Sequence, residues 1–196
     1  QAGGKGISLS SISGNGLTVD FDIIKDSTTK TNKATFKIYN LSTSSSAFIA
    51  QPQSIIEFFA GWEGITSRIF LGCCLSCDDV YSGGDKITSI VATDGGKELS
   101  ESVISIEEQN NTNSTKIFKD IAKQLGLSII FGKGIDEIAY NNGYSFVGKG
   151  QDSLTEVCDS IQAQWFINNG VINIVNYNSA GSNLGYELNA TTGLLG

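Results

Sequence analysis

The 196-residue chain contains no histidine, and only 13 of its residues are lysine or arginine. Histidine is the usual general base of nucleophilic hydrolysis, and no serine stands in a G-x-S-x-G pattern, so the sequence argues against an enzyme of that class. With 20 acidic residues against these 13 basic ones, the net charge is −7. Binding nucleic acid needs clustered lysine and arginine to neutralise phosphates, so we expect no stable contact with nucleic acid.

Long apolar runs, methionine and proline are also scarce. No apolar run approaches the roughly 20 residues of a membrane-spanning helix and no signal peptide is visible, so we expect a soluble chain without stable membrane insertion. Methionine is absent and the chain opens at Gln1, so we expect a piece of a longer protein that continues past Gly196. Proline occurs only at Pro52 whereas glycine occurs 23 times, which is typical of many tight turns.

The first half of the sequence contains alternating segments that predict antiparallel strands. Ala34, Phe36 and Ile38 alternate with polar residues, as in a strand with one buried face. Strands are predicted near 16–25, 34–40, 54–60, 67–79 and 86–94. The serine-rich stretch after Asn40 predicts a polar loop, and Ser82 to Asp85 predict a turn. Five or six strands at this spacing indicate a small β-barrel or sandwich.

After about Ser105 the apolar residues recur at helical spacing. Asn113 or Ser114 is placed to cap a helix that ends at Gly126. A second helix is predicted to begin at Ser153, which forms a capping box with Glu156, and Asn169-Gly170 predicts a hairpin. We therefore expect residues 1–105 to form the barrel, residues 106–178 to form an inserted α/β module, and residues 179–196 to return to the barrel. The fold class is α+β and mainly β.

The cysteines leave three interpretations open. They are Cys73, Cys74, Cys77 and Cys158, and Cys74 and Cys77 have C-x-x-C spacing. Zinc would need further ligands from a chain without histidine, and a structural disulfide is a second alternative. We favour reduced, buried side chains, with Cys73, Leu75 and Cys77 on one face of a strand.

Two glycine-rich segments resemble phosphate-binding loops only superficially. Residues Gly143 to Gly150 come close to G-x-x-x-x-G-K-[ST], but Gly150 stands where a hydroxyl is needed and the residues between the glycines look like a strand. Asp94-Gly95-Gly96-Lys97 is interpreted as a tight turn rather than an anion-binding nest. We predict no cofactor.

Three pairs of acidic residues are interpreted as surface groups rather than as an active site. Asp20 and Asp22 would share the solvent face of a strand, and the adjacent Asp78 and Asp79 would point to opposite faces. The third pair is Glu107 and Glu108. Glycosidase chemistry needs two carboxyl groups facing each other across a cleft. We predict no catalytic and no metal-binding residue.

The two tryptophans have different expected roles. Trp165 opens a strand behind an amphipathic helix and is expected in the core. Trp62 stands beside glycines in a turn, where it either packs locally or serves as an exposed anchor of a subunit interface. Trp62 is the one candidate site residue that the sequence provides.

The order of these segments resembles the hub proteins of contractile phage-tail baseplates, whose fold is shared by the hubs of related injection machines. The segments that carry the resemblance are KIYNLS, AGWEG, IFLG, ITSIVATDGGKELSES, IFKDIAKQLGLSI, GYSFVGKGQDSLTEVCDSI, WFINNGVINIV and LNATTGLLG. They cover most of the chain. Each is a packing or turn pattern of low specificity, and it is their number and order that make the resemblance specific.

The resemblance implies a tail-tube-like antiparallel β-barrel with an inserted α/β module, and a structural role in the virion. The chain would be a hub subunit of the tail baseplate, assembled in the host cytoplasm, that connects the tail tube to the central spike and lines the axial channel. Its partners would be further copies of itself in a ring, commonly a trimer, together with the tail tube protein, the central spike protein and other baseplate proteins. DNA would only pass through.

Two alternatives come from other classes of protein. The first is an envelope-docking module of a secretion or injection apparatus, because the α/β part superficially resembles small docking domains. The second is a tail-associated cell-wall hydrolase, which a muralytic assay on the purified chain would detect.

Overall fold

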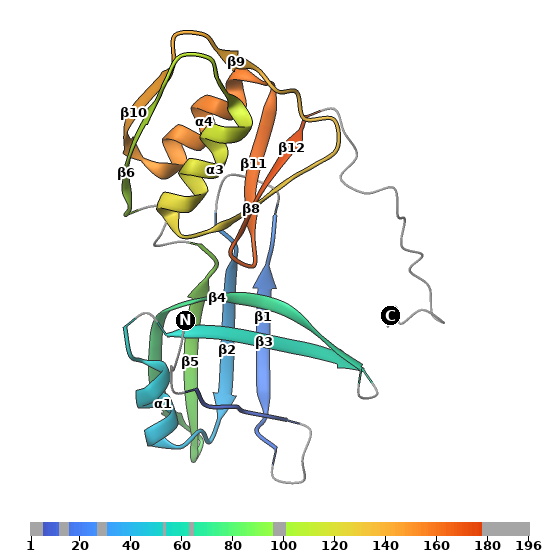
Figure 1. Cartoon of the computed structure of the whole chain (residues 1–196). Coiled ribbons are helices and arrows are strands. Elements are labelled where there is room, and N and C mark those ends of the chain that lie inside the picture. The colour runs from blue at the N-terminus through green and yellow to red at the C-terminus, as the bar shows by residue number, and fades with distance from the viewer. Residues whose placement is uncertain are drawn as a thin grey trace.

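The computed structural model describes residues 6–11, 16–26, 31–52, 54–62, 65–95 and 101–177. Two bodies with separate hydrophobic cores follow one another along the chain (Figure 1). We call the described residues up to 95 the sheet module and residues 101–177 the α/β module. The predicted limits at 105 and 178 stay a prediction, and the range 179–196 lies outside the described residues.

The sheet module is built on one five-stranded antiparallel sheet with the strand order β1-β2-β5-β4-β3. Its strands are β1 (Val19–Ile24), β2 (Lys33–Tyr39), β3 (Ile55–Trp62), β4 (Ile65–Ser82) and β5 (Asp85–Thr93). These lie close to the predicted segments because every second residue of β2 is apolar and buried, and burial alternates in the same way along most of β5. The turn between β4 and β5 is also as predicted, with Gly83 and Gly84 both at positive φ.

Strand β4 bends the sheet into a half-barrel. Its first half pairs with β3 and its second half with β5, and a β-bulge between Cys74 and Ser76 interrupts the pairing with β5 near its start. At this bend Gly72 has no room for a side chain, because an added Cβ would lie 2.4 Å from the carbonyl oxygen of Thr93. Figure 1 shows β3 and β4 crossing over the other three strands. The Phe21 ring of β1 and the Phe58 ring of β3 consequently lie 4.8 Å apart, centroid to centroid.

The serine-rich segment predicted as a loop is a short helix, α1 (Thr43–Ile49). The side-chain oxygen of Ser42 caps it by accepting a hydrogen bond from the Ser45 backbone at 3.2 Å. Ile49 of this helix and Leu41 before it belong to the core of the sheet module. The loop prediction was wrong because clustered serines also favour helix N-termini, and tertiary packing then decides.

The α/β module places two helices between small sheets. Helices α3 (Ser114–Leu125) and α4 (Gly150–Ser160) lie between the pair β6–β10 and the three-stranded sheet β11-β12-β8 (Figure 1). These strands are β6 (Val103–Glu108), β8 (Ser128–Phe131), β10 (Tyr144–Lys149), β11 (Ala163–Asn168) and β12 (Val171–Asn176), and a short pair joins β7 (Thr112–Asn113) to β9 (Ala139–Tyr140). Strand β8 runs parallel to β12, and the other pairs are antiparallel.

The ends of α3 agree with the prediction, and the start of α4 does not. Asn113 caps α3 by accepting a hydrogen bond from the Lys116 backbone at 2.8 Å, and Gly126 ends it in a left-handed conformation. Helix α4 begins at Gly150, so the predicted capping box at Ser153 and Glu156 is wrong. Ser153 is fully buried one turn further on, where its hydroxyl lies 3.1 Å from the hydroxyl of Tyr144.

The predicted fold class is confirmed: the protein is mainly β, with a curled antiparallel half-barrel and a small α/β module. Strand β5 lies in the middle of the sheet, between β2 and β4. The two terminal strands of the described sheet are β1 and β3.

Candidate interaction surface

Strand β1 is one open edge of the half-barrel. It pairs with β2 along its whole length, and among the described residues no strand pairs with its other side. Two of its apolar side chains, Phe21 and Ile24, are 50% and 61% exposed. An exposed edge strand without proline offers a row of backbone donors and acceptors to another chain. This edge is therefore a candidate for contact with another chain.

Strand β3 forms the opposite edge and has the same character. Ile55 and Phe59 are 57% and 51% exposed, and the register of β3 against β4 shifts between Phe58 and Phe59. An exposed ion pair joins Arg68 Nη1 to Glu57 Oε1 at 3.1 Å across the two strands. Within the described ranges, both ends of the half-barrel thus combine unpaired backbone with exposed apolar side chains, the combination found where proteins associate.

The sequence contained a signal for this surface that alternation alone does not reveal. Ile23 and Ile24 are adjacent, as are Ile55 and Ile56. Because neighbouring residues of a strand point to opposite faces, a pair of adjacent apolar residues places one side chain on each face. In both pairs one member packs against the core of the sheet module while the other is exposed.

Trp62, the residue predicted as a possible interface anchor, is the last residue of β3. Its backbone pairs with Ile65 across the β3–β4 connection. Its side chain lies outside the described residues, so its role at an interface stays a prediction. Trp165 is in the core as predicted, and its indole nitrogen donates a hydrogen bond to Thr155 Oγ1 at 3.0 Å.

An ion pair between a buried lysine and a partly exposed aspartate anchors α1 to the half-barrel. Lys86 Nζ lies 2.8 Å from Asp79 Oδ2, and the Lys86 residue is 9% exposed. Thr88 Oγ1 donates to the other carboxylate oxygen at 2.7 Å, and Ser46 Oγ donates to Asp79 Oδ2 at 2.9 Å. The ammonium of Lys86 and the two hydroxyls together hold the pKa of Asp79 below its ordinary value. Lys86 Nζ also donates a hydrogen bond to Ser46 Oγ at 3.1 Å, so the ammonium and the Ser46 hydroxyl meet at the same carboxylate.

Two of the three pairs of carboxylates, those on β1 and β4, lie on opposite or solvent-facing sides of their strands as predicted. Asp20 and Asp22 are both exposed on β1, and the Tyr39 hydroxyl donates to Asp20 at 3.1 Å. Asp78 is exposed on the strand face opposite to that of Asp79. The carboxylate of Asp79 is engaged by the ion pair described above, so these two neighbouring acids do not act together.

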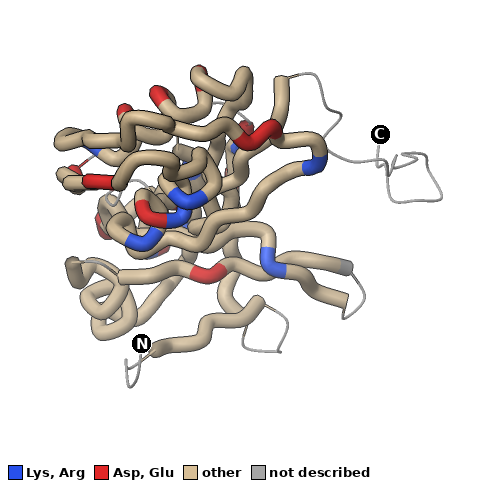
Figure 2. Tube along the Cα trace, turned by 45° about the horizontal axis from the view of Figure 1, so that its top comes forward, with Lys and Arg blue, Asp and Glu red and all other residues tan. Residues whose placement is uncertain are grey.

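Glu108 stands apart from Glu107 and joins a polar group between β6 and α3. Its carboxylate accepts a hydrogen bond from Lys116, whose ammonium also lies 3.8 Å from Asp120 Oδ2. Lys116 lowers the pKa of Glu108, whereas burial and the neighbouring Glu108 charge raise the pKa of Asp120. Figure 2 shows acidic and basic positions distributed over both modules.

The cysteines are free, but their predicted placement on the strand is wrong. The β-bulge shifts the alternation of β4, so that Cys74 and Cys77 pack against the core of the sheet module while Leu75 is exposed. Burial raises the pKa of Cys77 to about 11 and that of Cys158 to about 12, which keeps both thiols protonated at neutral pH. The described residues contain no cluster of three or more acidic or cysteine side chains suited to a metal ion.

The two glycine-rich segments are structural. The residues between Gly143 and Gly150 form strand β10, as predicted, and Gly150 opens α4. Asp94 and Gly95 form a bend in which Gly95 has φ +60° and the Asp94 carboxylate accepts hydrogen bonds from neighbouring backbone, while Gly96 and Lys97 lie outside the described residues. In the part of the chain that the structure describes, no helix has the length and hydrophobicity needed to cross a bilayer.

The fold is shared with phage tail proteins. No protein-family model matches the chain, and no curated protein matches it. Among solved structures, a tail protein from Neisseria meningitidis MC58 is similar with a TM-score of 0.60 and 12% sequence identity, covering 82% of this chain and 47% of that protein. The 43 kDa tail protein of prophage MuSo2 from Shewanella oneidensis is similar with a TM-score of 0.56 and 14% identity, covering 81% of this chain and 50% of that protein.

These similarities include both modules, because a match over four-fifths of the chain cannot come from one module alone. The chain spans about half the length of the two tail proteins it matches. At this level of identity the likeness concerns the fold, which is that of a phage tail protein.

Proposed function

We propose that this chain is a structural subunit of a phage tail and, within the tail, a hub subunit of the baseplate that connects the tail tube to the central spike. The observation that carries the proposal is the shared fold: a curled sheet and an α/β module together match two tail proteins at TM-scores of 0.60 and 0.56. The coarser part, a structural role in the tail, depends on the fold alone. The hub position depends in addition on the order of sequence segments that resembles baseplate hubs.

The open edges of the half-barrel support assembly into a ring. In the part of the chain that the structure describes, β1 and β3 each present a row of unpaired backbone, which is costly to leave exposed, and a neighbouring subunit that covers both rows removes this cost. Closed rings repeat one contact around an axis. We propose three copies around the tail axis, in contact with the tail tube protein, the central spike protein and other baseplate proteins.

The charge of the chain suits a channel through which DNA passes. The net charge is −7, so phosphate groups are repelled rather than captured. Among the described residues, the paired acids are either exposed or held in ion pairs, and we propose a protein without enzymatic activity whose place is the tail baseplate of the virion.

The location of the chain in an assembled tail tests this proposal. Electron cryo-microscopy of tails that carry the full-length protein should place three copies on the tail axis, between tube and spike. A position away from the axis would contradict the hub assignment, and absence from the tail with binding to cell envelopes would favour an envelope-docking module. In parallel, the purified chain should not lyse cell-wall preparations, and lysis would contradict the structural role.

A further inference from the structure

The sheet module and the α/β module meet at a seam that is polar and narrow. The tip of the β11–β12 hairpin, Asn168-Asn169-Gly170, reaches down to the half-barrel (Figure 1). Five hydrogen bonds join residues 167–169 to the sheet module. Modules joined by a small polar contact move relative to one another unless something specific fixes them. A specific contact is therefore needed to fix the orientation of the α/β module relative to the sheet module.

Asp94 is the centre of the seam and is fully buried. Its Oδ1 atom accepts a hydrogen bond from the backbone of Asn32 at 2.8 Å. Its Oδ2 atom accepts one from the Asn32 side chain at 2.8 Å and one from the backbone of Asn169 at 3.0 Å. One carboxylate at the end of the sheet thus binds both the start of β2 and the hairpin tip, and charged hydrogen bonds of this kind are stronger than neutral ones.

Asn169 supplies the second half of the contact through its side chain. Its Oδ1 atom accepts hydrogen bonds from Lys25 Nζ at 2.8 Å and from the backbone of Leu71 at 3.2 Å. Lys25 also donates to Asn168 Oδ1 at 2.9 Å. The hairpin tip is in this way tied to three separate parts of the half-barrel: the segment after β1, strand β4, and the bend after β5.

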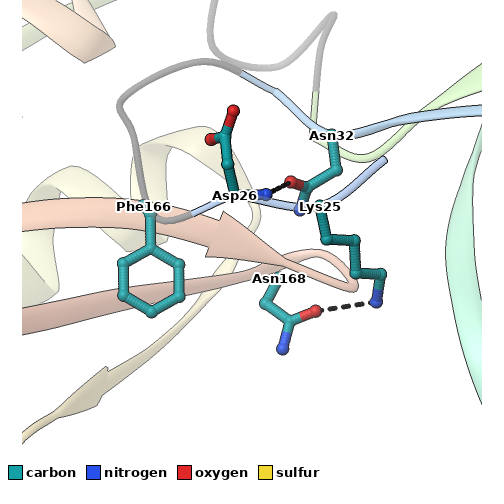
Figure 3. Close-up of a pocket in the computed structure, with 5 residues that line it drawn as sticks. All are labelled: Lys25, Asp26, Asn32, Phe166 and Asn168. Carbon is teal, nitrogen blue, oxygen red and sulfur yellow. Dashed lines mark hydrogen bonds between the residues drawn. The ribbon is translucent and has the colours of Figure 1, made fainter. Parts of the chain in front are cut away.

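The described residues leave part of the seam open. Beside the hydrogen bonds lies a pocket of about 490 Å³, lined by Lys25, Asp26, Asn32, Phe166 and Asn168 (Figure 3). Figure 3 shows the Lys25 side chain reaching across to the Asn168 amide. On the other side Gly95 lies close to Ile167, since a Cβ added to the glycine would come within 2.6 Å of Ile167 Cδ1.

We propose that Asp94, Asn32, Lys25 and Asn169 form a latch that locks the α/β module in one orientation on the half-barrel, and that breaking the latch frees the module without unfolding it. The proposal goes beyond the tail function and does not depend on it. The proposal follows from the concentration of the hydrogen bonds between the modules at one hairpin tip, where the Asn169 side chain accepts hydrogen bonds from two partners.

Two substitutions test the latch, and each removes a different set of its hydrogen bonds. Asn169→Gly removes the side-chain acceptor, and glycine keeps the backbone conformation because Asn169 has φ 53°. Asp94→Asn keeps the shape but replaces a carboxylate that accepts three hydrogen bonds by a group with one acceptor oxygen. The matched control is Asn111→Gly, the same change at φ 64° inside the α/β module and away from the seam.

The readout is the alignment of the two modules in solution, measured by residual dipolar couplings of the backbone amides. The wild-type chain should show one alignment tensor for residues 33–93 and 103–176. Asn169→Gly and Asp94→Asn should show two different tensors while the amide spectra of both cores stay folded, and the Leu71 amide should exchange faster in Asn169→Gly.

If Asp94→Asn fails to fold, the alignment tensors of Asn169→Gly alone test the proposal. A common tensor in Asn169→Gly would overturn the proposal, as would separate tensors in the wild-type chain. An equal loss of the common tensor in Asn111→Gly would overturn it too, because the effect would then not belong to the seam.

Discussion

The two modules of this protein are of similar length but bury their apolar side chains to different degrees. In the described residues, 17 buried side chains form the core of the α/β module, whereas 8 form that of the half-barrel. The half-barrel exposes large apolar side chains along its two edge strands, Phe21 and Ile24 on β1 and Ile55 and Phe59 on β3. The α/β module also exposes apolar side chains on its strands, Val103, Ile130 and Val147, but around a larger core. We therefore expect the α/β module to be the more self-contained of the two, and neighbours to cover the edges of the half-barrel.

The largest expected difference in stability is between removing a phenylalanine ring from the α/β module and removing one from the half-barrel. Phe118 is fully buried in α3, with its ring 5.9 Å from that of Phe131, whereas Phe21 is half exposed on β1. Phe118→Ala should lower the free energy of unfolding of the α/β module by about 3–5 kcal/mol. Phe21→Ala should cost the half-barrel only about 1 kcal/mol. Urea-dependent amide exchange, followed separately in each module, measures both losses of unfolding free energy. Equal losses in the two variants would contradict the proposed difference between the modules.

A smaller effect concerns the ion pair inside the half-barrel. Asp79→Asn leaves the buried ammonium of Lys86 without its carboxylate and should cost about 1–3 kcal/mol. Asp78→Asn, the same change at the exposed neighbour, should cost less than about 0.5 kcal/mol. Chemical denaturation of the two variants at neutral pH checks this difference.

The same pair predicts a dependence on pH. Because the folded protein holds the pKa of Asp79 below its ordinary value of 3.8, the ion pair stabilises the fold above that pH and loses this effect as the pH falls through the lowered pKa. The stability difference between the wild-type chain and Asp79→Asn should therefore shrink below about pH 4. A difference that stays constant down to pH 2 would show that the charge of Asp79 does not contribute.

Substitutions of exposed residues on the edge strands β1 and β3 should have the smallest effect on stability and the largest effect on assembly. Ile24→Asp and Ile55→Asp change exposed side chains of the two edge strands, so each should alter the free energy of unfolding by about 0.5 kcal/mol or less. Both should prevent incorporation into tails, because they place a charge on the surface that a neighbour covers. Ile130→Asp, an equally exposed isoleucine on β8 of the α/β module, is the matched control and should be incorporated normally.

Local sequence patterns predicted the elements whose ends depend on local chemistry. Asn113 and Gly126 mark the ends of α3, and Asn169-Gly170 forms the predicted hairpin, with both residues at positive φ. In these cases one side chain or one backbone conformation is enough to stop or turn the chain. The mainly β fold class followed in the same way from alternation and turns.

The features that the sequence did not reveal depend on contacts between distant segments. The start of α4 is held by the Gly150 amide, which donates to the carbonyl of Ser102 at 3.3 Å, rather than by a cap at Ser153. The bulge in β4 places Cys74 rather than Cys73 beside Cys77 against the core, and the strand order places β5 in the centre of the sheet. The Asp94 latch joins residues more than 60 positions apart, so no local pattern announces it.

Hydrogen exchange of the protein, free and in purified tails, tests the difference between the modules most directly. The account predicts that assembly slows amide exchange in β1 and β3, the two edges of the half-barrel, and leaves the core of the α/β module unchanged. Slower exchange in α3, α4 and β8 with unchanged β1 and β3 would contradict it, because the α/β module would then be the part that neighbours complete.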